Sequence, residues 1–157
     1  MNEWGEPCLE EMPIEEKERK WPKLRSDSYE IKSRCTIEYN CVAWVIGETA
    51  KWIDAYDDNP NWPRDLDRTQ TIQNYADFFQ RYGFEICSDG TFEVGIEKIA
   101  IYGDQLNLFT HVCLQLPSGG WTSKLGCLED IEHATTQSLC GQFYGDVVIC
   151  MRRERQR

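Results

Sequence analysis

Two segments in the first half of the chain carry patterns typical of helices. Six consecutive apolar residues over 41–46 follow Asn40, whose side chain can accept hydrogen bonds from the free N–H groups of a helix start. We therefore expect a helix over 41–53 that is buried nearly all round. In 69–82 the apolar residues recur at the three- and four-residue spacing of one helical face, and Gly83 can supply the C-cap.

The second half of the chain shows the patterns of short strands. Apolar and polar residues alternate over 109–116, and a Pro-Ser-Gly-Gly turn leads into 121–125, which should return antiparallel. Further strands are expected over 84–87, 95–102 and 144–151. A short helix is expected over 128–139. Two helices followed by a mostly antiparallel sheet predict an α+β fold.

The length of 157 residues fits one domain with polar ends. Residues 1–27 are predicted to form a polar arm, with one helical turn near 15–20, that lies on or beside the domain. Residues 28–153 should form the single α+β domain, and 154–157 a basic tail. A chain of this size buries roughly 68–70% of its unfolded surface, which is enough for a core without additional staples.

The net charge and the hydropathy of the chain limit the classes of partner that we expect it to bind. The chain has 17 lysines and arginines against 27 aspartates and glutamates, a net charge of −10, which disfavours general binding to nucleic acid. No apolar run approaches the length that spans a bilayer, and the N-terminus lacks the apolar region of a signal peptide. We expect a soluble, cytoplasmic protein that acts on a protein or peptide, without nucleic-acid or membrane partners.

Eight cysteines are spread along the chain, and no two have the C-x-x-C spacing. Without a secretion signal, reduced thiols are expected rather than disulfides. With only two histidines, a zinc site is not expected, and no other metal or organic cofactor is implied. Cys87, Cys113 and Cys150 lie in apolar strand-like runs and are interpreted as small buried hydrophobes.

Cys41 and His111 form the main candidate for chemistry. Cys41 lies at the expected start of a buried helix, where free N–H groups and aligned peptide dipoles lower a thiol pKa. His111 lies on a predicted strand seventy residues later and can withdraw the thiol proton. Asn40 could donate its amide to an oxyanion, together with the N–H of Cys41. A cysteine at a helix start followed by a histidine on an antiparallel strand is the layout of papain-like cysteine hydrolases.

A third group should orient the imidazole of His111, and the next strand is its expected source. A four-residue loop between the strands would place Thr122 and Lys124 on the face of His111, whereas a three- or five-residue loop, or a bulge, would place Ser123 there. Protonated Lys124 cannot accept a hydrogen bond from a histidine N–H. Ser123, Thr122 and a backbone carbonyl therefore remain as alternatives.

The second histidine, His133, is expected on the helix over 128–139. Glu129 would then lie four residues before it and Asp130 three residues before it, as in many surface pairs. One face of one short helix offers too few ligands for a metal, so these residues are interpreted as structural. A dyad of Ser123 with Lys124 is discounted, because adjacent residues on a strand point to opposite faces.

Several short motifs resemble those of an uncharacterised bacterial domain family. The resemblance covers roughly residues 36–153 and is carried by the strings NCVAWVIG (40–47), NWP (61–63), EKIAIY (97–102), TH (110–111), WTSKLG (121–126), EDIEH (129–133) and YG (144–145). The order of cysteine and histidine is also similar to that of the wider papain-like group, which includes CHAP-type amidases, transglutaminase-like enzymes and toxin deamidases. This resemblance implies a papain-like fold, with N-terminal helices packed on the sheet, and chemistry at an amide bond through a thioester. Cys41 would be the nucleophile and His111 the base.

Two functions follow from these observations. The first is a cysteine hydrolase or acyl transferase acting on an amide bond, as a peptidase, an amidase, a protein deamidase or a transglutaminase. The alternative is a non-catalytic protein-binding or immunity-type module with the same fold. In that case the six tryptophans would form partner surfaces, with Trp4 and Trp21 on the arm expected to be exposed.

Overall fold

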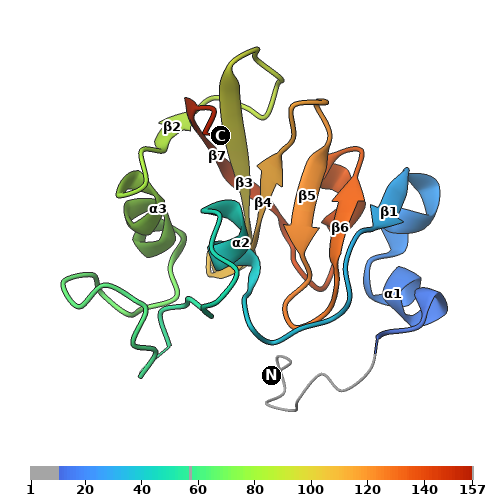
Figure 1. Cartoon of the computed structure of the whole chain (residues 1–157), viewed down its shortest axis with the longest axis horizontal. Helices are drawn as coiled ribbons and strands as arrows, with labels where there is room; N and C mark the ends of the chain where they lie inside the picture. The colour runs from blue at the N-terminus through green and yellow to red at the C-terminus, as the bar shows by residue number, and fades with distance from the viewer. Residues whose placement is uncertain (1–10, 57, 157) are drawn as a thin grey trace.

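The computed structural model describes residues 11–56 and 58–156. Within these residues seven strands form one sheet in the order β1-β6-β5-β4-β3-β7-β2, and all neighbouring strands are antiparallel (Figure 1). The strands are β1 (Tyr29–Ile31), β2 (Glu85–Cys87), β3 (Ile96–Gly103), β4 (Phe109–Gln115), β5 (Trp121–Lys124), β6 (Asp130–His133) and β7 (Asp146–Glu154). The α-helices are α1 (Ile14–Lys20), α2 (Cys41–Val45) and α3 (Ile72–Gln80), and the 3-10 helices are η1 (Pro22–Ser26) and η2 (Thr136–Leu139). The predicted α+β class with a mostly antiparallel sheet is confirmed.

The two helices predicted in the first half of the chain both form, but only one of them has close to its predicted length. Helix α3 forms inside the predicted range, and the Thr71 side chain caps it by accepting a hydrogen bond from the Asn74 N–H. The prediction of a helix over 41–53 is wrong beyond the first turn, because α2 ends at Val45. Gly47 adopts a φ of +81°, a left-handed conformation that ends the helix and turns the chain away from it.

The predicted helix over 128–139 is wrong. Its first part is strand β6, which pairs with β5 on one side and with β1 on the other, and only its end forms the short helix η2. Strand β1, which was not predicted, covers three residues and completes the pairing. Tertiary pairing therefore overrides the local preference for helix in this segment.

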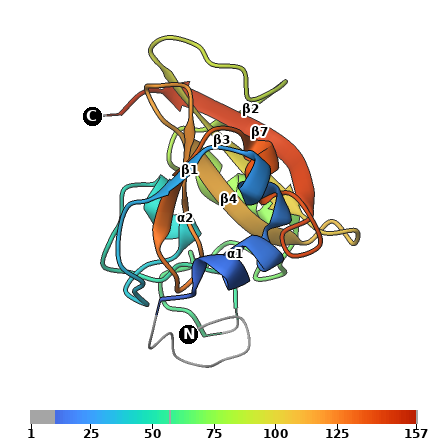
Figure 2. The ribbon, with the colours of Figure 1, turned by 90° about the vertical axis from the view of Figure 1, so that its right-hand side faces the viewer.

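The sheet separates two hydrophobic clusters. Helices α2 and α3 pack on one face, where Ile99 and Ile101 of β3 point (Figures 1 and 2). Ala100 and Tyr102 alternate with them and point to the opposite face, which the arm and η2 cover. Each face therefore has its own core, and a residue on β3 or β4 contacts one core or the other.

The described part of the arm belongs to this second core. Trp21 is only 2% exposed and packs against the rings of Phe143 and Tyr144, so the expectation that Trp21 is exposed is wrong. Lys17 of α1 forms a buried ion pair with Glu129, which ties the arm to the chain after β5. Trp4 lies outside the described residues. Among the described helices, none combines the length and the apolar character that crossing a membrane requires.

Candidate functional site

The site lies beside the first residues of β4, beyond the end of its ladder with β5. The ladder between these two strands pairs Leu114 with Thr122 and Gln115 with Trp121, and it does not extend to the first residues of β4, although both strands are fully described. The connecting loop therefore has five residues, 116–120. This is the register that places Ser123 on the face of His111, and Thr122 faces the other way, where its hydroxyl accepts a hydrogen bond from the Trp44 indole.

Three side chains on neighbouring strands form a hydrogen-bonded row, which we call the histidine cluster: His111, Ser123 and His133. The Nε2 atom of His111 lies 3.0 Å from the Ser123 hydroxyl, which lies 2.8 Å from Nε2 of His133. The Nδ1 atom of His133 lies 2.8 Å from the carbonyl oxygen of Thr135. The cluster thus runs across β4, β5 and β6 and ends on the main chain, and all three side chains are buried.

The hydrogen bonds of this row determine where each proton lies. The Thr135 carbonyl can only accept, so His133 carries its proton on Nδ1 and, when neutral, accepts from the Ser123 hydroxyl at Nε2. The Ser123 oxygen must then accept from the Nε2–H of His111. The Nδ1 atom of His111 therefore keeps a free lone pair, and it has no hydrogen-bond partner among the described residues.

Both imidazoles are held neutral. Burial, together with the neighbouring His133, lowers the pKa of His111 well below its usual 6.5. Burial lowers the pKa of His133 to about 4. The ring of Tyr144 stacks on His111 with centroids 4.2 Å apart and planes 2° apart, and Tyr102 packs against His111 at 5.3 Å. His111 is thus fixed in orientation, and its Nδ1 has no hydrogen-bond partner among the described residues.

Cys41 lies at the first position of α2, and its side chain is buried, with 7% of the residue exposed. Burial raises the pKa of its thiol to about 11, while a hydrogen bond from the Val112 backbone and the charge of Lys124 act in the opposite direction. The N–H groups of Cys41 and Val42 at the helix start lower this pKa as expected, but the net shift is upward and not downward. Helix α2 has only five residues, so its dipole is small, and desolvation of the thiolate outweighs it.

Cys41 and His111 approach one cavity from opposite faces of the sheet. Helix α2 covers the face to which Val112 points, whereas His111 points to the face of Tyr102. No hydrogen bond joins the Cys41 sulfur to the His111 ring within the described structure. The two residues nevertheless line the same cavity of about 720 Å³, which we call the Cys41 cavity. The lining of this cavity includes the first residues of β4, from Phe109 to His111, and none of the residues of β5.

Asn40, the expected oxyanion donor, holds the start of α2 in place. Its side-chain oxygen accepts hydrogen bonds from the N–H groups of Ala43 and Ile53, each at 3.2 Å, and its amide donates to the Ile53 carbonyl at 2.7 Å. Asn40 also lines the Cys41 cavity. One of its two amide hydrogens is therefore committed to the main chain, and the second is available to a ligand.

The other expected residues lie as follows. Lys124 points away from Ser123, over the ring of Tyr39, and donates to the carbonyl of Thr36, so the two residues do not form a dyad. His133 lies on a strand and not on a helix, and its ring belongs to the histidine cluster. His133 lies two residues after Ile131 on the same face of β6, and this two-residue spacing of buried side chains is the signal that could have indicated a strand.

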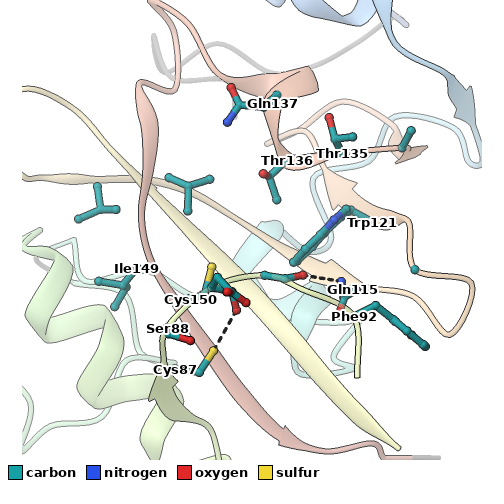
Figure 3. Close-up of a pocket in the computed structure, with 16 residues that line it drawn as sticks. Cys87, Ser88, Phe92, Gln115, Trp121, Thr135, Thr136, Gln137, Ile149 and Cys150 are labelled. Atoms are coloured by element: carbon teal, nitrogen blue, oxygen red, sulfur yellow. Dashed lines mark hydrogen bonds between the residues drawn. The ribbon is translucent and has the colours of Figure 1, made fainter. Parts of the chain in front are cut away.

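A second cavity, which we call the Cys87 cavity, is lined by residues of β2, β4, β5 and β7 and by 134–137, and has a volume of about 640 Å³ (Figure 3). Cys87 of β2 and Cys150 of β7 are direct cross-strand neighbours there, and Gln115 and Trp121 line the cavity beside them. Cys113 and Cys150 are buried as expected, whereas Cys87 is partly exposed and donates to the Asp89 carbonyl.

The bonding state of the cysteines differs in part from the expectation of reduced thiols. Cys127 is disulfide-bonded, so the expectation of reduced thiols does not hold for this residue. The other described cysteines are free: Cys35, Cys41, Cys87, Cys113, Cys140 and Cys150. Residues 11–56 and 58–156 contain no group of three or more histidine, cysteine, aspartate or glutamate side chains that could hold a metal ion.

The fold and the site together define an α+β domain in which a buried thiol and a neutral, hydrogen-bonded histidine line one cavity. Residues 30–152 match the model of a domain family of unknown function (DUF7689), and the chain belongs to this family. No curated protein and no solved structure matches the chain.

Proposed function

We propose that the protein is a papain-like cysteine hydrolase or acyl transferase that acts on an amide bond, with Cys41 as nucleophile and His111 as base. The observation that carries this proposal is the free lone pair on Nδ1 of His111, at a buried histidine that shares a cavity with a buried thiol. The other nitrogen of that ring is occupied by Ser123. A base that is oriented at one nitrogen and free at the other is what nucleophilic catalysis requires.

The first half-reaction forms a thioester. The Cys41 sulfur attacks the carbonyl carbon of the amide as its proton passes to Nδ1 of His111, and the carbon–nitrogen bond breaks as His111 returns that proton to the leaving amine. The resting groups are a neutral thiol and a neutral imidazole, because burial raises the pKa of Cys41 to about 11 and lowers that of His111. Proton transfer therefore accompanies the attack and does not precede it.

The second half-reaction releases the acyl group. His111, neutral again, takes a proton from water as the water oxygen attacks the thioester carbon, and the Cys41 thiol leaves with that proton. An amine in place of water would give acyl transfer, so peptidase, amidase, deamidase and transglutaminase activities share this chemistry. The second amide hydrogen of Asn40 and the main-chain N–H groups at the start of α2 are the donors proposed for the oxyanion.

The chemistry requires Cys41 to turn toward His111. In the described structure the sulfur interacts with the Val112 backbone, and the turn would take it into the cavity that both residues line. Catalytic hydrogen bonds are often long or absent without substrate and tighten in the complex. Ser123 acts here as a positioning residue, because it holds the tautomer of His111 that leaves Nδ1 free.

Thiol labelling tests the proposal with a matched control inside the same chain. Cys113 is a buried thiol on β4 next to the site, but it faces Tyr102 and not the Cys41 cavity. With iodoacetamide at pH 7 and peptide mapping, we expect Cys41 to react at least tenfold faster than Cys113, and His111→Ala to remove that advantage. Ser123→Ala serves as a second variant if His111→Ala does not fold. Equal slow labelling of Cys41 and Cys113, with the partly exposed Cys35 and Cys87 reacting first, would overturn the proposal.

The alternative is a non-catalytic binding module, and one observation favours it: the raised pKa of Cys41, whose sulfur is not hydrogen-bonded to His111 among the described residues. In that case His111→Ala leaves all labelling rates unchanged.

A cytoplasmic location remains part of our proposal and is supported by the six free described thiols, while the disulfide-bonded Cys127 argues against a fully reducing environment.

A further inference from the structure

The walls of the Cys41 cavity are strongly aromatic. The aromatic residues that line it are Trp52, Tyr56, Tyr75, Phe109, Phe143 and Tyr144. Two of them, Tyr75 and Phe109, stack on one another with ring centroids 3.7 Å apart. Aromatic faces carry negative electrostatic potential and attract cations. The cavity therefore offers both apolar contact and a preference for positive charge.

Among the described residues that line the cavity, the only charged side chain is negative. Among the described residues that line it, Asp54 is the only carboxylate, and none is a lysine or an arginine. Asp54 accepts hydrogen bonds from the Trp52 indole at 2.9 Å and from the Tyr56 N–H at 3.0 Å, one on each oxygen. Each carboxylate oxygen has a second lone pair, so both can still accept from a ligand. Asp54 is partly exposed, and a ligand can reach it.

The negative charge of Asp54 acts inside the cavity. Burial, and to a smaller extent the charge of Asp54, raises the pKa of Tyr75, whose hydroxyl donates to Gln70, another lining residue. Three cations lie beside the cavity: Arg68 donates to the Tyr56 carbonyl at 2.8 Å, Lys20 lies 3.8 Å from the ring centroid of Phe143, and Lys124 donates to the Thr36 carbonyl. None of them is within ion-pair distance of Asp54 in the described structure. The Asp54 carboxylate is therefore the part of the lining open to a cation.

We infer that the Cys41 cavity takes a peptide or protein segment with a lysine or arginine side chain next to the reacting amide, and that Asp54 and the surrounding aromatic rings hold the cationic head. This inference rests on the proposed function for the identity of the amide. The net charge of −10 assists it, because an acidic protein attracts basic segments. A glutamate or aspartate side chain at the same place would face the charge of Asp54.

The test measures binding without turnover. Cys41→Ala removes the nucleophile, and calorimetry compares acetylated tetrapeptide amides that differ at one central residue: arginine, norleucine or glutamate. We expect the arginine peptide to bind at least tenfold more tightly than the norleucine peptide, and the glutamate peptide to bind more weakly than both. Adding Asp54→Asn should reduce the preference for arginine to less than threefold. Adding Asp65→Asn instead is the matched control, since Asp65 pairs with Arg81 at an exposed site, and should leave the preference unchanged.

The outcomes separate this inference from the proposed function. A preference for arginine that Asp54→Asn removes, in a protein whose Cys41 labels no faster than Cys113, would retain the cation site and reject the enzyme. Fast labelling of Cys41 together with equal binding of the three peptides would reject the cation site alone. Salt provides a second measurement if Asp54→Asn does not fold, because raising the ionic strength from about 0.05 M to about 0.5 M should weaken only the arginine peptide. Failure of all peptides to bind Cys41→Ala would overturn the inference.

Discussion

The region around α3 and the histidine cluster are both buried, but they are held together differently. Around α3 the core is apolar and aromatic, with Trp62 stacked on Phe78 at a centroid distance of 5.0 Å and Phe79 fully buried. In the histidine cluster the buried atoms are polar, and hydrogen bonds join them in a fixed order. Apolar packing tolerates small adjustments, whereas a buried polar atom without its partner costs about 1–3 kcal/mol. The cluster therefore defines positions and protons more strictly than the core around α3.

The largest effect on stability is expected in the apolar region. Phe79→Ala removes a fully buried ring and should lower the free energy of unfolding by about 3–5 kcal/mol. The loss should be the same at pH 7 and at pH 5, because no titrating group is removed. Urea unfolding at both pH values measures it. Tyr82→Ala, at a partly exposed ring that packs on Phe78, is the control and should cost clearly less.

The histidine cluster should instead make stability depend on pH. An unfolded histidine has a pKa of about 6.5, and His133 in the fold has a pKa of about 4, so the unfolded state binds the proton first as the pH falls. The stabilisation is fully present above pH 6.5 and is lost as the pH falls to about 4, which corresponds to about 3 kcal/mol for His133.

His133→Gln isolates this contribution, since glutamine offers a donor and an acceptor without titrating in this range. Urea unfolding between pH 7 and pH 4 should show a fall in stability that is about 3 kcal/mol smaller in the variant. The same fall in both proteins would mean that His133 is not the titrating group, and that the contrast between the two regions is not electrostatic.

Removing the middle of the cluster should have a smaller effect on stability and a clear effect on chemistry. Ser123→Ala leaves buried nitrogens of His111 and His133 without a partner and should cost about 1–3 kcal/mol. It also frees His111 to adopt the other tautomer, so labelling of Cys41 should slow at least tenfold. Ser118→Ala, in the exposed loop between β4 and β5, is the control for both measurements. Unchanged labelling would remove Ser123 from the proposed mechanism.

The smallest effect is expected at the start of α2. Asn40→Ala removes the cap bond to Ala43 and the bonds to Ile53 and should cost about 1 kcal/mol. Asn40→Asp keeps the cap and is the matched control. Thermal unfolding compares the two variants, and a cost in Asn40→Asp as large as in Asn40→Ala would assign the effect to the amide and not to the cap.

Much of the fold followed from local patterns. The spacing of apolar residues predicted α3, and alternation predicted β4. The strands expected over 95–102 and 121–125 correspond to β3 and β5, and all three strands were predicted to within two residues at each end. The Asn40 cap was also correct. The site was harder, because the position of Ser123 depended on whether the loop after β4 had four or five residues, and the sequence allowed both.

The sequence by itself determined the elements whose signals are local: periodic apolar faces, side-chain caps and turn residues act between neighbours along the chain. Only the tertiary structure decided that 130–133 is a strand, because its stability comes from pairing with β5 and β1. The same holds for the charge states of Cys41 and His111, since desolvation depends on what covers a group and not on its place in the sequence. Burial and strand pairing are properties of the whole chain, and they determine both the histidine cluster and the cavity that it shares with Cys41.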